Sequence, residues 1–325
     1  TGLYPLSQDV LIRNLAGGAT NRFLIQGSTN EAAGGSRLDF LARTNSLRIE
    51  ESDGVHLRYM RIYNANQGVQ VQLATNTLVE WVWTVNGVNG FALVSATNTE
   101  FRQCLAMGNS SYGLSHGDAA GGTLWQGGVL WSNQGAAVSL SSGNQGGSLA
   151  VRHSVLGVFG SGRYAYYLAS TRVPLEADYN DGRLRQGARA GYLFVTPGPA
   201  VYYQSVSRWA RDFGVDRHSL VEDPAFATPG SDFHLKSDAP QGRFVSGAGF
   251  TATDAFSSRL IDAGDPTAVY TNEPDPNGKR INIGLHGNTG EASKTATNGW
   301  LTLISLNDGG RAEGEVDLTW VAGGI

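Results

Sequence analysis

Between positions 55 and 156, apolar residues follow one short pattern that returns about every 22 residues. In each copy two apolar positions lie two residues apart, the next follows after three residues, and the last after two more. A spacing of two is typical of a β-strand, and the step of three indicates a bend that keeps these side chains on the inner side. The copies are Val55, Leu57, Met60, Ile62; Thr77, Val79, Val82, Thr84; Thr99, Phe101, Cys104, Ala106; Thr123, Trp125, Gly128, Leu130; and Leu149, Val151, Ser154, Leu156.

This repeat predicts the fold class. Copies of this length cannot bury a core alone, so they must stack and align equivalent residues above one another. The leucine frame of a leucine-rich repeat is missing, and a propeller blade needs roughly 40–50 residues. We therefore predict an all-β protein, a right-handed parallel β-helix (solenoid) with an irregular C-terminal capping region. The recurrence of Ala-Thr-Asn-Thr at 74–77 and 96–99 places Asn76 over Asn98, where we expect an amide ladder.

The repeat fades after position 157, which suggests a division of the chain. We expect β-helix coils of about 22 residues over 1–215, C-terminal coils and a cap over 216–299, and a linker or first strand of a following β-sandwich module over 300–325. The segment 207–213 (SRWARDF) is the one short stretch that reads as a helix.

Composition excludes several classes of protein. The net charge of −4 provides no field that would attract nucleic acid, so we expect no nucleic-acid partner. The single cysteine, Cys104, excludes an intrachain disulfide framework and a cysteine-clustered zinc site. No run approaches the ~20 apolar residues of a membrane-spanning helix, so we expect no membrane span.

Several C-terminal segments resemble those of secreted bacterial right-handed parallel β-helix repeat proteins, which have a pectate-lyase-like architecture. The matching segments are 178–180 (DYN), 216–226 (DRHSLVEDPAF), 231–235 (SDFHL), 260–266 (LIDAGDP) and 277–293 (NGKRINIGLHGNTGEAS). The resemblance implies segments that close the last coils and cap the solenoid, and an extracellular or cell-surface location. It does not imply one activity, because such proteins include polysaccharide lyases, glycoside hydrolases, epimerases and adhesins.

The outward positions of the coils also stack, and they bring arginines beside aromatic residues. Trp and Tyr rings stack on sugar rings, and Arg binds carboxylate or sulfate groups in a bidentate manner. These positions predict a face that binds an acidic polysaccharide. Its candidate substrate-binding residues are Arg58, Tyr59, Glu80, Trp81, Trp83, Arg152 and His153. In the alternative interpretation, Arg58, Glu80 and Arg102 neutralise one another, and the Trp residues pack beneath a loop or a neighbouring module.

Two further groups are candidates for chemistry. His116 and Asp118, with Arg102, form the candidate catalytic set, in which a carboxylate orients a histidine that acts as a general base. An interior histidine hydrogen-bonded to the backbone is the alternative. Glu176, Asp178 and Asp181 are candidate ligands for Ca²⁺, although no cofactor is required by the sequence. Their alternative role is in a turn.

The function that we expect is an extracellular β-helix module that binds an acidic polysaccharide. Such a module could also depolymerise its ligand, as a lyase or a glycoside hydrolase. The alternative is a non-catalytic structural or adhesive stalk in a larger cell-surface protein. The enzyme hypothesis requires the outward Arg and Trp residues to lie open beside an acid/base pair, whereas the stalk hypothesis requires them to be paired or covered.

Overall fold

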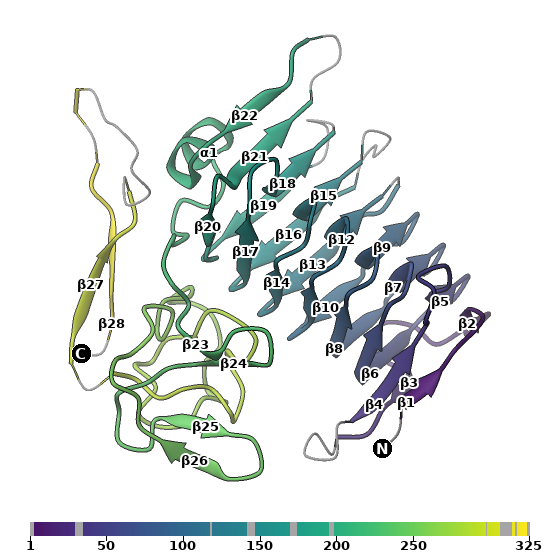
Figure 1. Ribbon diagram of the computed structural model, residues 1–325, viewed down its shortest axis with the longest axis horizontal. Helices are drawn as coiled ribbons and strands as arrows, with labels where there is room; N and C mark the ends of the chain where they lie inside the picture. Colours follow the sequence, from purple (N-terminus) through teal and green to yellow (C-terminus); the bar gives the residue numbers. More distant parts are fainter. Residues whose placement is uncertain are drawn as a thin grey trace.

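The computed structural model describes residues 3–29, 35–117, 119–141, 147–169, 174–194, 198–296, 298–305, 314–315 and 317–323. The described residues form a parallel β-solenoid, whose coils succeed one another from the N-terminal end to the helix α1 (Val206–Phe213) (Figure 1). The prediction of an all-β protein with a parallel β-helix is therefore confirmed. Two large sheets, of nine and 13 strands, form the walls of the solenoid.

The nine-stranded sheet contains one strand from each successive coil. Its neighbours are parallel except for the last pair, β21 and β22, which is antiparallel. In order, the strands are β2 (Val10–Arg13), β5 (Leu47–Glu50), β7 (Gln67–Gln72), β9 (Asn89–Val94), β12 (Tyr112–His116), β15 (Ala136–Leu140), β18 (Tyr164–Leu168), β21 (Arg189–Leu193) and β22 (Val201–Tyr203).

The 13-stranded sheet is bent along its length, so that it supplies two walls. The long strands β6 (Val55–Tyr63) and β8 (Leu78–Val85) cross the bend, and in later coils each is replaced by two shorter strands. On one side of the bend lie β3 (Phe23–Gln26), β10 (Glu100–Arg102), β13 (Thr123–Gln126), β16 (Leu149–Arg152) and β19 (Leu175–Asp178). On the other side lie β1 (Leu3–Pro5), β4 (Ser36–Asp39), β11 (Leu105–Met107), β14 (Val129–Trp131), β17 (Val155–Phe159) and β20 (Leu184–Arg185).

The strand registers match the repeat in the sequence. Leu57 pairs with Val79, Val79 with Phe101, and Phe101 with Trp125, and all four side chains are completely buried. Met60 likewise lies beside Val82, as the pattern predicts. Asn98 donates to Asn76 over 3.4 Å from its side-chain amide, which confirms the predicted ladder. Identical neighbours are favourable here because parallel strands repeat the same environment every ~4.8 Å.

The step of three residues in each copy is a bend in left-handed backbone conformation. Tyr59, Trp81, His153 and Tyr179 all have φ between 51° and 56°, and Gly127, with φ of 60°, holds the same position in another coil. The left-handed conformation costs a non-glycine residue roughly 1–2 kcal/mol. In β6, Leu57 and Met60 are three residues apart, one more than the strand spacing of two, and the bend at Tyr59 keeps both side chains directed inward. The burial of the apolar rows on both sides of the bend offsets the cost of this conformation.

The helix α1 closes the end of the solenoid near β21. Ser205 caps its N-terminus by accepting from the backbone N–H of Arg208, and Gly214 ends it with φ of 74°. Trp209 is fully buried and stacks on Tyr166, with ring centroids 5.2 Å apart and 5° between the planes. The helix expected over 207–213 is confirmed, and its Trp209 covers apolar side chains that a further coil would otherwise cover.

The remaining C-terminal segment lies along the side of the solenoid. Among the described residues it adds no strand to either large sheet; it forms the hairpins β23 (Phe226–Thr228) with β24 (Asp232–Leu235), and β25 (Arg243–Val245) with β26 (Gly249–Ala252). A third hairpin joins β27 (Trp300–Leu303) to β28 (Trp320–Gly323). A second apolar core, which includes Phe226 and Phe233 of this segment, covers the outer face of β11, β14 and β17.

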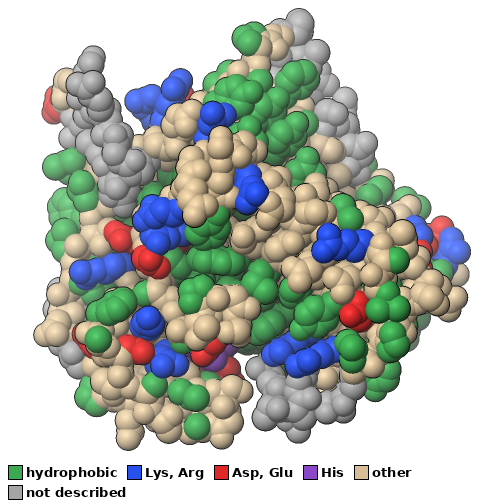
Figure 2. All heavy atoms as spheres, viewed as in Figure 1, with side chains coloured by type: hydrophobic (Ala, Val, Ile, Leu, Met, Phe, Trp, Pro, Cys, Tyr) green, Lys and Arg blue, Asp and Glu red, His purple; other side chains and the backbone are tan. Residues whose placement is uncertain are grey.

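The helices agree with the exclusion of a membrane-spanning helix that was drawn from the sequence. No helix in the described parts of the chain has the length and apolar character to cross a bilayer. Figure 2 shows Lys and Arg side chains interspersed with Asp and Glu over the face that it presents.

Candidate functional site

An elongated groove lies between the solenoid and the C-terminal segment. One side is the outer face of β8, β10, β13, β16 and β19, and the other is the segment 265–289, here called the groove wall. Two adjoining hollows of about 600 and 440 Å³ form the groove, and both are lined by Gln126, Val269 and Asn288. Five strands at a spacing of about 4.8 Å make the groove about 19 Å long, enough for several sugar residues.

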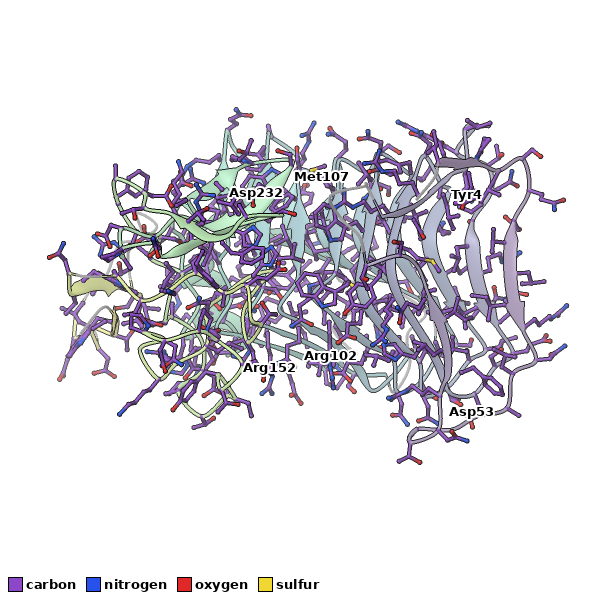
Figure 3. The ribbon with its side chains drawn as sticks, turned by 90° about the horizontal axis from the view of Figure 1, so that it is seen from below. Tyr4, Asp53, Arg102, Met107, Arg152 and Asp232 are labelled. Atoms are coloured by element: carbon purple, nitrogen blue, oxygen red, sulfur yellow. The ribbon has the colours of Figure 1, made fainter. Side chains whose placement is uncertain are left out.

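The repeat of the sequence builds the strand side of this groove. Outward residues of successive coils lie in register: Arg58 with Glu80, Glu80 with Arg102, Arg102 with Gln126, and Gln126 with Arg152. Figure 3 shows Arg102 and Arg152 on the same edge of the molecule, opposite Met107 and Asp232. Two strand spacings, about 10 Å, separate these arginines along the groove. This outward row is the one that the sequence predicts.

The groove wall is attached to the bend of the solenoid through His153. The backbone N–H of Gly284 donates to the His153 carbonyl over 2.8 Å, and the backbone N–H of Asp265 donates to His153 Nε2 over 3.2 Å. Because Nε2 accepts this bond, the neutral ring carries its proton on Nδ1. Burial lowers the pKa of His153 to about 4, so the ring is neutral at pH 7. His153 lines the groove, but its role there is to hold the wall.

Both groove arginines are already paired with a carboxylate and yet remain open to solvent. Arg102 donates from Nε and Nη2 to the two carboxylate oxygens of Glu100, over 2.5 and 2.9 Å. Arg152 Nη2 lies 3.2 Å from Oε2 of Glu176. Each arginine side chain is 46% exposed, so both retain donors that can reach a ligand in the groove.

The predicted Arg58–Glu80–Arg102 row is in register, but its described contacts run to other residues. Arg58 donates from Nε to Gln26 over 2.8 Å, and Glu80 lies 3.4 Å from His56 Nε2. Arg102 binds Glu100 of its own strand. The alternative in which these three residues form one ion-pair ladder therefore does not describe their contacts. Arg58 pairs instead with Gln26, its in-register neighbour on β3, whereas Glu80 and Arg102 pair with His56 and Glu100, which lie two positions away from this row.

The structure divides the predicted aromatic face between the groove and a packed interior. Trp81 lines the groove, and its ring lies 5.5 Å from that of His286 beneath the wall. Trp83 packs edge-on against Phe233 and lies below the guanidinium of Arg61, whose Cζ is 4.2 Å from the ring centroid. Tyr59 carries the Arg58 guanidinium over its ring at 5.2 Å. Trp81, with Glu80, Arg102, Arg152 and His153, therefore lines the groove, whereas Arg58, Tyr59 and Trp83 do not.

His116 and Arg102, the two candidate catalytic residues that the structure describes, are not brought together. His116 lies in β12 at the inward position between Leu93 and Leu140, and its side chain is fully buried. Its Nε2 lies 3.2 Å from Thr123 Oγ1, and burial lowers its pKa to about 4. Arg102 points outward on the other sheet. Asp118 lies outside the described residues. His116 therefore has the contacts of the alternative, an interior histidine.

The three carboxylates considered for Ca²⁺ have separate partners. Glu176 binds Arg152, and Asp178 accepts from the ring of His218 over 2.7 Å. Asp181 is completely buried, and burial raises its pKa well above its usual value, while its Oδ1 accepts from the backbone N–H of Glu222. A carboxyl whose charged form is disfavoured by burial is a poor ligand for Ca²⁺. The geometry therefore does not bring these residues to one cation.

Sequence reasoning missed two features of the molecular surface, one in the groove and one on the nine-stranded sheet. Asp265, Val269, Asn272 and Asn288 of the groove wall line the groove, although they are more than 85 residues along the chain from the strands that they face. The second feature is a group of stacked tyrosines on the outer face of the nine-stranded sheet, where Tyr167 and Tyr192 lie 4.6 Å apart at 8°. The high Tyr content of 164–203 was the signal for it.

No protein-family model, curated protein or solved structure matches this chain. The fold is therefore assigned from the strand topology alone.

Proposed function

We propose that this protein binds an acidic polysaccharide in the groove between the solenoid and the groove wall. Arg102 and Arg152 would bind carboxylate or sulfate groups, and the amides of Gln126, Asn272 and Asn288 would bind hydroxyl groups. Polymers of this kind occur outside cells, so the proposal includes an extracellular or cell-surface location. The observation that supports it best is the continuous groove across five strands, with two open arginines on its floor.

The spacing within the groove fits a linear polymer. The arginines stand about 10 Å apart, roughly the length of two sugar residues, so both could bind acidic groups of one chain. Trp81 lies toward the β8 end of the groove, where its ring offers an apolar surface to a sugar ring. A ligand that displaced Glu100 or Glu176 from its arginine would replace one charge-assisted hydrogen bond with another, so the exchange costs little.

Cleavage of the polymer is a separate hypothesis. It requires an acid and a base in the groove, and the described groove residues that could act are Glu80, Glu176 and Asp265. Burial alone would raise the pKa of Asp265, but hydrogen bonds from the backbone N–H and hydroxyl of Thr267 outweigh it and lower the pKa. Asp265 is therefore suited to the role of base rather than acid at neutral pH.

The second candidate function is a structural or adhesive stalk. It is favoured by the carboxylate partners of Arg102 and Arg152, since paired charges on stacked strands need no ligand. The two candidates differ in what happens when acidic oligosaccharides are added. A stalk has no measurable affinity for them, whereas the groove binds them through its arginines.

Calorimetric titration with uronate oligosaccharides and with neutral oligosaccharides of the same length tests the proposal. We expect the wild type to bind the uronate series. Arg152→Gln should lower the affinity about tenfold or more, because it removes a charge-assisted hydrogen bond worth about 1.5 kcal/mol. Arg13→Gln is the matched control, because Arg13 pairs with Glu51 and is 45% exposed but lies far from the groove in the first coil. Its affinity should equal that of the wild type.

The outcomes separate the hypotheses. Equal affinity in Arg152→Gln and Arg13→Gln, or no binding of any oligosaccharide, would overturn the groove proposal, and the second result would favour the stalk. Release of unsaturated products, followed by their ultraviolet absorbance, would identify a lyase. Release of reducing ends without such absorbance would identify a hydrolase.

A further inference from the structure

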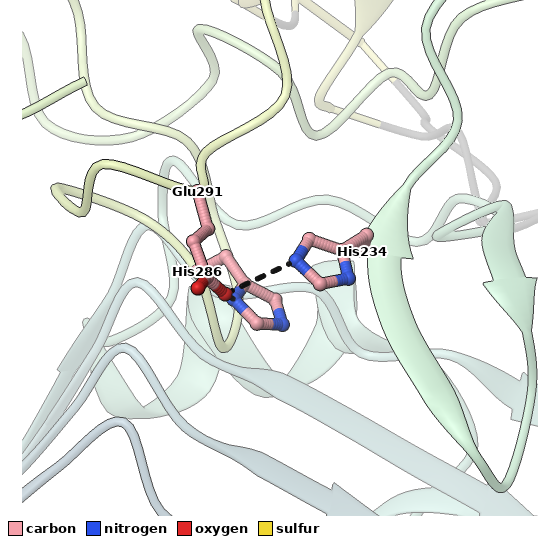
Figure 4. A group of neighbouring side chains, drawn as sticks. All are labelled: His234, His286 and Glu291. Carbon is pink, nitrogen blue, oxygen red and sulfur yellow. Dashed lines mark ion pairs between the residues drawn. The ribbon is translucent and has the colours of Figure 1, made fainter. Parts of the chain in front are cut away.

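Two histidines and a glutamate from distant parts of the C-terminal segment converge beside the groove wall (Figure 4). His234 lies in β24, whereas His286 and Glu291 lie in the loop that ends the groove wall. Figure 4 shows both imidazole rings directed toward the Glu291 carboxylate. The side chains are thus assembled by the tertiary structure.

The distances between the possible ligand atoms of these three side chains are close to those between neighbouring ligands of one metal ion. Oε2 of Glu291 lies 3.4 Å from His234 Nε2 and 3.6 Å from His286 Nδ1, and the three ligand atoms all lie within 4.8 Å of one another. Zinc bound at about 2.0–2.2 Å by nitrogen and oxygen in a tetrahedron places its ligands roughly 3.3–3.5 Å apart. The two rings are stacked at 3.6 Å with 14° between their planes, so both must tilt for their lone pairs to converge.

One nitrogen of each imidazole ring is buried without a hydrogen bond to a described residue. His234 Nε2 and His286 Nδ1 are both inaccessible to solvent, and neither makes a hydrogen bond of normal geometry among the described residues. Both nitrogens face the same acceptor, Glu291 Oε2, at ion-pair distances that are longer than a normal hydrogen bond. A buried polar atom without a hydrogen bond costs about 1–3 kcal/mol, which a bound ligand between the three atoms would offset. Two such atoms beside one carboxylate, which is 43% exposed and opens the site to solvent, indicate a cation.

A second carboxylate holds His234 in the tautomer that ligation needs. Asp232 Oδ1 lies 2.7 Å from His234 Nδ1, and it also accepts from the backbone N–H of the same residue over 3.0 Å. An Nδ1–H bonded to Asp232 leaves the lone pair on Nε2, the nitrogen that faces Glu291. Metal-binding histidines are commonly oriented by a carboxylate in this way.

The geometry points to a divalent transition-metal site formed by His234, His286 and Glu291, with Zn²⁺ as the best match. Two imidazoles and one carboxylate are a ligand set typical of zinc, with a fourth position taken by water, whereas Ca²⁺ and Mg²⁺ prefer sites made only of oxygen. A bound metal would join β24 to the groove wall. The inference is independent of the proposed polysaccharide, because it concerns only the C-terminal segment.

Calorimetric titration of the full, untagged chain with ZnCl₂, together with the visible spectrum of the Co²⁺ form, tests this site. We expect one bound Zn²⁺ per chain and the intense visible bands of tetrahedral Co²⁺. Glu291→Gln should weaken Zn²⁺ binding at least tenfold, and His286→Ala should abolish the Co²⁺ bands. Asp232→Asn should weaken binding about 10- to 100-fold, as for a residue that positions a ligand.

His218→Ala is the matched control, because His218 also pairs with an aspartate, Asp178, over 2.7 Å but lies outside the cluster. It should bind Zn²⁺ like the wild type. Glu291→Gln alters a half-exposed side chain, so its fold can be verified by an unchanged melting temperature in metal-free buffer. Wild-type affinity in Glu291→Gln and His286→Ala, loss of binding in His218→Ala, or octahedral Co²⁺ bands would each overturn the assignment.

Discussion

The coils between residues 47 and 168 and the segment between residues 216 and 296 stabilise their interiors in different ways. In the coils, a row such as Leu57, Val79, Phe101 and Trp125 repeats one apolar environment from strand to strand. In the C-terminal segment, buried polar side chains bond to the backbone of irregular loops. Stacked strands satisfy their own backbone groups, whereas loops need side chains for this purpose.

Glu273 and Asn282 show how the C-terminal segment is held. The carboxylate oxygen Oε1 of Glu273 accepts from the backbone N–H groups of Asn282 and Asn288, over 2.8 and 2.7 Å. The Asn282 side chain donates to the Ser293 carbonyl and accepts from the backbone N–H of Asp262. The comparison indicates that removing a buried apolar side chain should destabilise the coils most. In the C-terminal segment, the free energy of unfolding should depend on the charge of single side chains.

The largest effect is expected from Trp125→Ala in the coils. Trp125 is fully buried, and its ring lies 5.3 Å from Phe91 and 5.5 Å from Phe101. Removing it leaves a large cavity, which should reduce the free energy of unfolding by about 3–5 kcal/mol in urea denaturation. Trp320→Ala, at a side chain that is 60% exposed, should change it by less than about 0.5 kcal/mol. A loss below about 1 kcal/mol for Trp125→Ala would show that stacked apolar rows do not dominate coil stability.

An intermediate effect, which grows as the pH rises from 4.5 to 8, is expected from Glu273→Gln. Burial raises the pKa of Glu273 from 4.5 to about 8, so folding favours the protonated form. The wild type should therefore lose stability as the pH rises from 4.5 through 8, and the neutral glutamine should not. Urea denaturation at both ends of this range should show the variant gaining about 2–4 kcal/mol relative to the wild type. Parallel pH profiles for the two proteins would contradict the comparison.

The smallest effect is expected from His116→Leu in the coils, where the wild type should lose stability as the pH falls rather than as it rises. Burial lowers the pKa of His116 from 6.5 to about 4, so folding favours the neutral ring. The stability that depends on this neutral ring should be lost as the pH falls from 6.5 through 4. His116→Leu matches the neighbours Leu93 and Leu140 and should reduce this acid loss by about 2 kcal/mol. The exposed His218→Leu is the control, and an unchanged acid midpoint in His116→Leu would contradict the prediction.

The candidate site was predictable only on the side that the repeat builds. The pattern placed Glu80, Arg102 and Arg152 on one outward face, and the register confirms that placement. The pattern could not show that Trp83 packs against Phe233, or that Arg102 pairs with Glu100. A periodic pattern specifies inward and outward positions, but it carries no information about which distant segment covers an outward one.

Local periodicity alone determined the parallel coils, their register and the asparagine ladder, because each depends on neighbours that the repeat supplies. The short helix was determined by its own local sequence. The groove, the position of the C-terminal segment and the meeting of His234 with His286 were decided by the tertiary structure. Those features join residues separated by 50 to more than 100 positions, and they arise where buried polar groups find partners. Such partners are specified by three-dimensional packing and leave no period in the chain.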